Sequence, residues 1–377
     1  MKVLLTGSNW KIGIAAAYSL AKKGLTVIGT DDRKLPFNMH SRHLKGHYIH
    51  APFSDKKFYE DILSIIKKER PDVLLLLGGT KQISLNKKEI SKYVNVLVPD
   101  YESYNKVYDK RETYKICKEE GIAVPNRYTD EEASCIFGKN KNHKLVIKPD
   151  YDIGGARGLS FVGSIEELND AKIYIESIGS SYIIEDYIPG ASRMRAVQII
   201  FDKKNKILEY FILKKIRQFP VTGGITAYAE STNEYNLLEF VMPFFEKCRW
   251  EGPVEVELII DERDGKPRLI EINPRFPGSM AFAIQCGINF PFTNCMAAIN
   301  TGNFETASNY KSGIYYINFS YYLRSVIKEF RAAKNIYAII NKIFKELKQK
   351  KVGILIDKND FPVYLAKAVK ELKLFSN

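Results

Sequence analysis

The stretch PVEVELIIDERDGKPRLIEINPRF, residues 253–276, predicts two strands joined by a tight turn. Apolar and polar side chains alternate along Pro253–Ile260 and again along Arg268–Phe276, as they do in strands with two different faces. Residues 263–265 make a three-residue loop, a favoured hairpin connection when Gly265 is left-handed. That loop sets Glu257 opposite Glu271 and Glu255 opposite Asn273.

Facing carboxylates destabilise a hairpin, so this one needs a cation. Glu257, Glu271 and Asn273 offer only oxygen ligands, which Mg²⁺ and Mn²⁺ prefer. Mg²⁺ commonly takes one or two carboxylates and completes its shell with nucleotide phosphates and water. Glu255 shares a face with Glu257 and is the alternative first ligand. Arg275, on the face of Glu271, suits an anionic substrate or a phosphoryl oxygen. A solvated acidic edge is the other interpretation, disfavoured by the apolar opposite face.

Two glycine-rich loops differ in strength. The lysine of Val146-Ile147-Lys148-Pro149 ends a predicted strand and precedes the loop Gly154–Gly158, an arrangement that suits a polyphosphate. The loop Gly7–Gly13, with Asp31 at the end of the next strand, is a weak dinucleotide motif because Asn9 replaces the middle glycine. It leaves a nicotinamide-dependent oxidoreductase as a competing class.

Hydrophobic patterning predicts an open parallel sheet at the N-terminus, because strands and helices alternate there. Its expected elements are strands 2–6, 26–30 and 73–77 and helices 14–23 and 58–69. Further on we expect helices 105–120, 165–178 and 236–248, short strands 145–148, 159–162 and 182–185, mainly strands over 195–272, mostly helix over 280–301, and a helical, lysine-rich tail.

Size and composition fit a globular chain of two or three domains: 377 residues, 45% hydrophobic and 27% charged. The net charge of +13 is spread as lysine doublets, which favours a solvated surface over nucleic-acid binding. The sequence shows neither a membrane-spanning run nor a signal peptide, and its five scattered cysteines indicate buried thiols in a reducing compartment. We therefore expect a cytoplasmic protein with no nucleic-acid or membrane partner.

The motifs together resemble the ATP-grasp superfamily, nearest to its carbamoyl-phosphate synthase large-subunit and biotin carboxylase branch. The resemblance is carried, in order, by Lys110, by Lys148-Pro149 before Gly154–Gly158, by Glu185–Ile188 and by Glu271–Phe276. It spans roughly residues 1–300.

The resemblance implies roles for individual residues. The ATP-binding residues it implies are Lys110, Lys148, Gly154, Gly155, Arg157, Gly158, Glu185, Asp186, Tyr187 and Ile188. It implies metal binding by Glu257, Glu271 and Asn273, and makes Arg275 catalytic. The basic segment Lys214–Gly224 is the candidate contact for the acceptor or the carboxylate, with Arg217 as a second catalytic residue; an ordinary basic strand and loop is the alternative.

The expected fold is α/β and α+β multidomain. A Rossmann-like pre-ATP-grasp domain (1–104) precedes a linker helix and small lid (105–188), a large ATP-grasp subdomain (189–305) and a helical extension (306–377). The expected activity is ATP-dependent ligation: a carboxylate becomes an acyl phosphate and is transferred to an amine or a similar nucleophile, with Mg²⁺ or Mn²⁺ as cofactor. Partners are small-molecule carboxylate and amine substrates, and a homodimer is left as an option. A catalytically degenerate ATP-grasp protein is the non-enzyme alternative.

Overall fold

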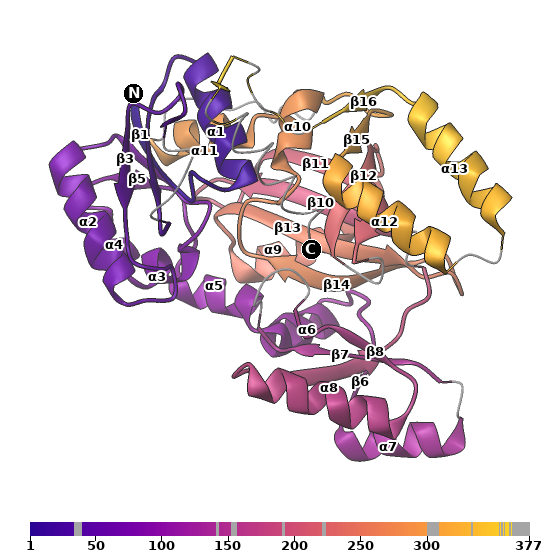
Figure 1. Ribbon diagram of the computed structural model, residues 1–377. Coiled ribbons are helices and arrows are strands. Elements are labelled where there is room, and N and C mark those ends of the chain that lie inside the picture. The colour runs from indigo at the N-terminus through magenta and orange to yellow at the C-terminus, as the bar shows by residue number, and fades with distance from the viewer. Residues whose placement is uncertain are drawn as a thin grey trace.

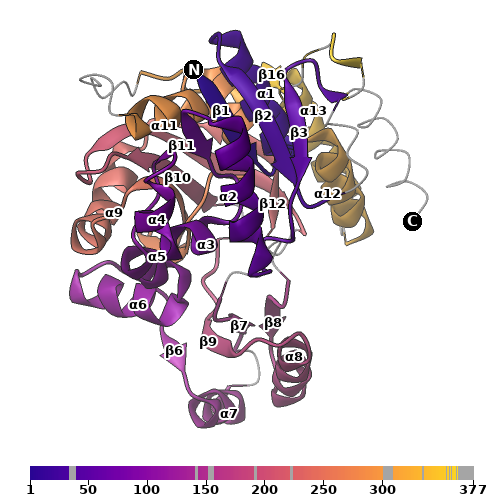
Figure 2. The same cartoon turned by 90° about the vertical axis from the view of Figure 1, so that its left-hand side faces the viewer.

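The computed structural model describes residues 1–33, 40–140, 143–151, 157–190, 193–220, 224–299, 309–332, 335–353, 355, 357, 359–361 and 363. The described strands form three sheets: an N-terminal sheet, a small sheet and a large sheet (Figure 1). The large sheet lies in the middle of the molecule, with the N-terminal sheet beside it and the small sheet at one end (Figures 1 and 2).

The N-terminal sheet is parallel, in the order β3-β2-β1-β4-β5, which confirms the predicted open parallel sheet. Its strands are apolar on both faces because helices cover both faces, and Val3, Leu4 and Leu5 are fully buried. The elements are β1 (Lys2–Thr6), β2 (Thr26–Asp31), β3 (Gly46–Ile49), β4 (Val73–Leu75), β5 (Asn95–Val96), α1 (Lys11–Lys22), α2 (Lys57–Glu69), α3 (Thr80–Leu85) and α4 (Lys87–Ile90).

The first glycine loop of this sheet is closed by packing. A Cβ atom on Gly13 would lie 2.3 Å from the carbonyl oxygen of Gly7, so only glycine fits. The Asp31 carboxylate accepts a hydrogen bond from the backbone N–H of Asn9 at 3.1 Å. Both features have structural explanations that need no bound nucleotide.

The helix predicted over 105–120 is two helices, α5 (Tyr101–Tyr108) and α6 (Lys110–Glu119). Asp109 breaks it: its backbone is extended, and its side chain accepts a hydrogen bond from the N–H of Arg111 at 2.8 Å as an N-cap. The break places Lys110 at the first position of α6, where its ammonium donates to the carbonyl of Pro149.

The small sheet is antiparallel, in the order β6-β9-β7-β8, with α7 and α8 packed against it. We refer to this unit as the lid. Its elements are β6 (Arg127–Tyr128), α7 (Asp130–Lys139), β7 (Leu145–Pro149), β8 (Ser160–Val162), α8 (Ile165–Ser177) and β9 (Tyr182–Asp186).

The large sheet has the order β14-β13-β10-β11-β12-β15-β16, and β16 alone pairs in parallel among its described strands. Its elements are β10 (Met194–Phe201), β11 (Ile207–Phe219), β12 (Ile225–Ser231), α9 (Tyr235–Cys248), β13 (Gly252–Ile260), β14 (Pro267–Asn273), α10 (Met280–Cys286), α11 (Phe290–Ala298), β15 (Tyr315–Ile317), α12 (Phe319–Arg331), α13 (Ile336–Lys348) and β16 (Lys351–Val352).

Three further details of the fold differ from the sequence prediction. The helical run predicted from residue 280 is interrupted at Gly287, between α10 and α11. The tail is not purely helical, because β15 pairs with β12 and extends the large sheet. One of the five cysteines predicted to be buried, Cys135, is exposed; the other four are buried.

The two faces of the large sheet bury different cores. Val197, Val254 and Val256 pack under α9 and the linker helices on one face. Ala196, Phe211 and Leu213 pack on the other face together with α10, α11 and the N-terminal sheet. The lid covers the continuation of this second face, where the side chains become polar.

Candidate active site

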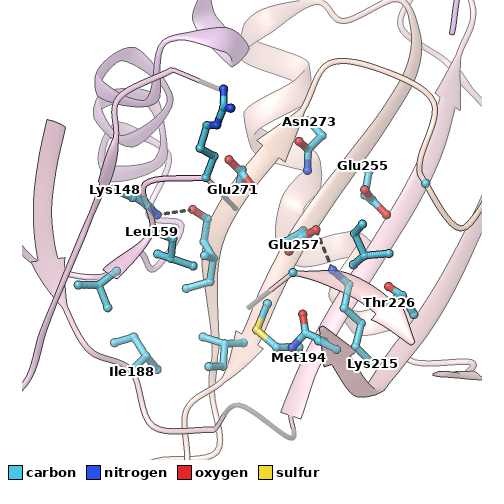
Figure 3. A pocket seen from close by; sticks show the side chains of 18 of the residues that line it. Lys148, Leu159, Ile188, Met194, Lys215, Thr226, Glu255, Glu257, Glu271 and Asn273 are labelled. Carbon is cyan, nitrogen blue, oxygen red and sulfur yellow. Dashed lines mark hydrogen bonds and ion pairs between the residues drawn. The ribbon is translucent and has the colours of Figure 1, made fainter. Parts of the chain in front are cut away.

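A cavity of about 280 Å³ lies between the lid and the large sheet (Figure 3). Strands from both sheets supply its walls, so residues far apart in sequence meet there. Twelve of the residues predicted for the site line this cavity, one of them Glu255, the alternative metal ligand. The other eleven are Lys110, Lys148, Arg157, Glu185, Asp186, Tyr187, Ile188, Glu257, Glu271, Asn273 and Arg275.

The register predicted for the hairpin at its acidic end is confirmed. Glu257 pairs with Glu271, and Glu255 pairs with Asn273. On β13 the carboxylates face the cavity while Val254, Val256 and Leu258 are buried in the opposite core, as the alternation predicted.

The turn, however, is not the one that led to this register. Asp261 pairs with Lys266, so four residues form the loop, with Gly265 left-handed at φ +72°. A β-bulge compensates: Glu257 pairs with Glu271 but Leu258 pairs with Leu269, which leaves Ile270 as the extra residue. Regular alternation along Arg268–Phe276 would put Leu269 on the face of Glu271. Because of the bulge Leu269 lies in the core instead, and Ile270 lines the cavity.

Two lysines reach the cavity from the lid side. The Lys148 ammonium lies 2.6 Å from the Glu185 carboxylate and donates to the Ile270 carbonyl, freed from the regular ladder by the bulge, at 3.1 Å. The Lys110 ammonium lies 3.1 Å from Glu271 and donates to the Pro149 carbonyl at 3.0 Å. Both side chains are buried and aimed at the acidic hairpin, so they bring positive charge to one side of the cavity.

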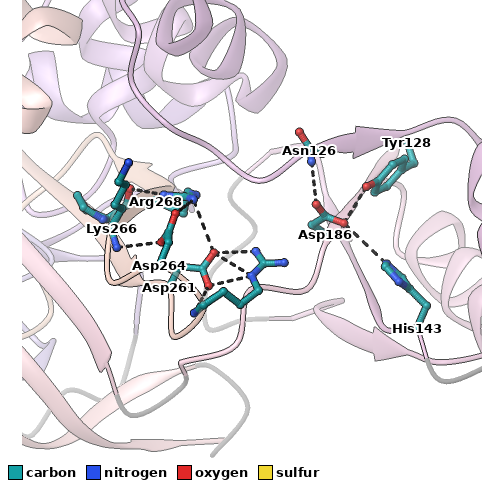
Figure 4. Close-up of polar contacts among 10 residues, drawn as sticks. Asn126, Tyr128, His143, Asp186, Asp261, Asp264, Lys266 and Arg268 are labelled. Carbon is teal, nitrogen blue, oxygen red and sulfur yellow. Dashed lines mark hydrogen bonds and ion pairs between the residues drawn. The ribbon is translucent and has the colours of Figure 1, made fainter.

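The acidic side chains of strand β9 are bound to neighbouring elements. Glu185 accepts from the Tyr114 hydroxyl at 2.7 Å as well as from Lys148, so its carboxylate is a structural partner of the lysine. Asp186 accepts from Asn126 at 2.9 Å and from Tyr128 at 2.8 Å, and His143 lies 3.8 Å away (Figure 4). Because the side chains of Glu185 and Asp186 already have partners, the backbone of Asp186–Ile188 is the part of this segment that could contact the base of a nucleotide.

A third lysine, Lys215 on β11, was not singled out by the sequence. Its ammonium lies 2.7 Å from the Glu257 carboxylate in the floor of the cavity (Figure 3), and only 3% of its side chain is exposed. Burial by itself would lower the pKa of Lys215, but the charges of Glu257 and Glu255 outweigh it and raise that pKa. One indication of Lys215 was present in the sequence, because this residue belongs to the basic segment Lys214–Gly224.

Arg217, predicted to be catalytic, does not line the cavity. Its guanidinium donates to the Glu346 carboxylate at 2.8 Å and also binds Glu329, both on helices of the tail. The cause is an irregular register: Lys215 pairs with Ala229, but Arg217 pairs with Tyr228. The irregularity turns Arg217 to the opposite face from Lys215, where it packs with Tyr228 beneath α12.

The remaining predicted residues divide. Arg157 lines the cavity, whereas Gly158 is not among the lining residues. Gly154 and Gly155 lie outside the described residues. Arg275 donates to the side-chain oxygen of Asn273 at 3.1 Å, which holds its guanidinium at the mouth of the hairpin.

Electrostatics distinguish the Glu271 carboxylate from that of Glu255. Burial would raise the pKa of Glu271, but the charges of Lys110 and Lys148 lower it below its ordinary value, so this group stays ionised. Burial and the charge of Glu257 raise the pKa of Glu255, which donors from Gln198 and the charge of Lys215 only partly offset. Glu271 is thus the better cation ligand of the two.

These residues fit a Mg²⁺ ion that shares its shell with phosphates. Within the described ranges, no three His, Cys, Asp or Glu side chains gather to hold a metal by themselves. Glu257 and Glu271 lie opposite each other, Asn273 lines the same cavity, and lysine ammoniums neutralise both carboxylates in the structure. That is the donor set of a metal held jointly by protein and nucleotide.

Comparison with known proteins agrees with this geometry. Residues 107–279 match the family model of the ATP-grasp domain. A D-aspartate ligase from Enterococcus faecium is 24% identical over 311 residues, which are 76% of this chain and 74% of that protein. The C-terminal section of a carbamoyl phosphate synthase large chain from Methanopyrus kandleri is 25% identical over 61% of this chain, which spans only 45% of that relative.

Solved structures share the fold. A biotin carboxylase complex from Campylobacter jejuni superposes with a TM-score of 0.65 at 16% identity, over 83% of this chain and 74% of that one. An N5-carboxyaminoimidazole synthetase from Staphylococcus aureus, complexed with ADP, gives 0.62 at 15%, over 80% and 78%. The chain therefore carries an ATP-grasp domain within a multidomain α/β fold, as the motifs indicated. None of its described helices is long and apolar enough to cross a membrane.

Proposed function

We propose that the protein is an ATP-dependent carboxylate–amine ligase that works through an acyl phosphate. The observation that carries the proposal is the pairing of Glu257 with Glu271 in a cavity that also holds three lysines. The similarity to a D-aspartate ligase over 76% of the chain supports this reaction type over other ATP-dependent chemistries.

In the first step a carboxylate oxygen of the substrate attacks the γ-phosphorus of ATP, and ADP leaves. Lys110 and Lys148 neutralise charge on the polyphosphate from the lid side, while Glu257, Glu271 and Asn273 would hold Mg²⁺ on the other. The metal, when bound, supplies further neutralisation of the phosphoryl oxygens. Carboxylates are poor electrophiles, and this step converts a bad leaving group into phosphate.

In the second step the nucleophile attacks the acyl carbon, phosphate leaves, and the amine gives up a proton. Arg275, fixed by Asn273, is positioned for the anion that develops on the acyl oxygen. Lys215 takes the place of Arg217 as the basic residue of β11 that can contact an anionic substrate, because it faces the cavity. The carboxylate and the amine are small molecules. A homodimer and a cytoplasmic location stay predictions.

The decisive measurement is nucleotide product and isotope transfer. Purified protein with Mg·ATP is screened for ADP release against a matrix of carboxylic acids and amines. For the active pair, the carboxylate is labelled with ¹⁸O, and the label is expected in released phosphate. Release of AMP and pyrophosphate would refute the acyl-phosphate route.

Two variants separate catalysis from folding. Glu271→Gln removes a carboxylate from the cavity and should abolish turnover. Glu262→Gln removes one from the turn of the same hairpin, outside the cavity lining, and should leave turnover unchanged. A thermal shift with Mg·ATP but no turnover with any acid and amine would favour a degenerate nucleotide-binding protein instead.

A further inference from the structure

The helix α13 is apolar on two faces, and one of these faces is exposed to solvent. Its inner face packs against α12 and the large sheet through Ile339 and Ile343. Its outer face carries five exposed large side chains: Ile336, Tyr337, Ile340, Phe344 and Leu347. Tyr337 is 74% exposed and Phe344 is 60% exposed, so neither side chain contributes much to the packing of the fold.

The five side chains form one stripe. Ile336, Ile340, Phe344 and Leu347 are spaced by four, four and three residues, which places them on the same side of a helix. Tyr337 lies beside them, in reach of Phe344. A contiguous apolar surface of this kind marks an interaction site. In Figure 1, α13 lies at the outer edge of the molecule, with the lid helices α7 and α8 at the other end.

The charges on α13 and just after it are mainly positive, and Glu329 of α12 is already paired with Lys342 at 2.8 Å. Residues 335–353 contain five lysines and one acidic residue, Glu346. Glu346 is buried and bound to Arg217, so it contributes no outward negative charge. Lys345 and Lys348 are exposed at the polar border of the stripe, and no ion pair is recorded for them in the described part of the chain.

This charge distribution selects the partner. A second copy of α13 would bring lysines against lysines, which is repulsive. An anionic lipid surface offers phosphates to the lysines and an acyl boundary to the apolar stripe, the combination that holds amphipathic helices in a membrane interface.

We propose that α13 docks the protein on anionic lipid bilayers, with the stripe Ile336–Leu347 at the headgroup boundary and Lys345 and Lys348 against lipid phosphates. This is peripheral binding and needs no spanning helix. It departs from the expectation of no membrane partner, which considered only spanning and targeting segments. It is independent of the proposed ligase activity.

The test is sedimentation of the full chain with vesicles of phosphatidylglycerol and phosphatidylcholine, compared with phosphatidylcholine alone. Binding is expected to the anionic vesicles and to weaken with salt. The pair Lys345→Gln and Lys348→Gln should weaken binding roughly 30-fold, at about fivefold per lysine. The pair Tyr337→Ser and Phe344→Ser should weaken it by about tenfold or more.

Matched controls come from elsewhere on the surface. Lys56→Gln with Lys57→Gln removes the same charge from the N-terminal domain, and Ile173→Ser with Tyr174→Ser removes exposed apolar groups from the lid. Both pairs should bind vesicles as the wild type does. Circular dichroism and the Mg·ATP thermal shift verify that every variant is folded.

Three outcomes would overturn the proposal. One is no preference for anionic vesicles. Another is equal weakening by the Lys56 and Lys57 control, which would show that net charge alone attracts the protein. The third is a concentration-dependent dimer, abolished by Phe344→Ser, without vesicle binding; the stripe would then pair with a second copy.

Discussion

Replacing Lys215 by methionine tests whether the acidic floor of the cavity depends on a lysine. The ammonium lies 2.7 Å from Glu257, and the two side chains are 3% and 20% exposed. Removing one partner of a buried ion pair costs about 3–5 kcal/mol, because the other charge is left uncompensated. Glu257 keeps some contact with water, so we expect a loss near the lower end, about 3 kcal/mol.

The loss should depend on pH in a defined direction. Burial and the charge of Glu257 already raise the pKa of Glu255, and without Lys215 that pKa in the folded state rises further above its value in the unfolded chain. A carboxyl group with a raised folded pKa stabilises the fold when it is protonated. The deficit of Lys215→Met should therefore shrink as the pH falls from about 8 to about 5, and also when Mg·ATP is added, since the ion supplies the missing charge.

Urea denaturation at several pH values, with and without Mg·ATP, measures these differences. Lys214→Met is the matched control, because the neighbouring side chain does not line the cavity. A deficit below about 1 kcal/mol, or one equal to that of Lys214→Met, would show that Lys215 does not hold the acidic floor together.

The remaining predictions concern the metal, the lid and one buried acid. Glu257→Gln should abolish Mg²⁺-dependent ADP release while Glu255→Gln retains most of it; the reverse result assigns the first ligand to Glu255. Mg·ATP should slow proteolysis at residues 154–158, since a loop over phosphates must open for exchange, and equal rates with and without nucleotide would count against a closing lid. Burial raises the pKa of Glu209 from 4.5 to about 7. The wild type should thus lose about 3 kcal/mol of stability as pH rises through that window, and Glu209→Gln should remove this dependence in urea titrations; an unchanged dependence would assign it to another group.

The alternation of apolar and polar residues was sufficient to predict the acidic hairpin at the centre of the site. The alternation along Pro253–Ile260 predicted which side chains face the core, because a strand between a core and a cavity must alternate. The parallel N-terminal sheet followed from apolar strands separated by helices. Lys148 and the acidic hairpin were found because each belongs to a motif that can be recognised without knowledge of the rest of the chain, whereas Lys110 came only from the family resemblance.

Side-chain direction at irregular positions was decided only by the tertiary structure. Lys215 and Arg217 have the same spacing as two residues on one face, yet the broken register with β12 sends one into the cavity and the other beneath α12. The loop of the hairpin has four residues where three were predicted, and the bulge at Ile270 offsets this difference, so Glu271 still pairs with Glu257.

The contribution of the tail to the cavity could be learned only from the tertiary structure. Tyr316 and Asn318 line the cavity, although they come from a segment beyond the family match. They do so because β15 pairs with β12 and continues the large sheet beyond it. Bulges and edge pairings are set by packing between distant segments, and no local pattern encodes them. The sequence by itself therefore determined which motifs come together at this cavity, and the tertiary structure decided which basic residue of β11 faces it and which segment of the tail completes its lining.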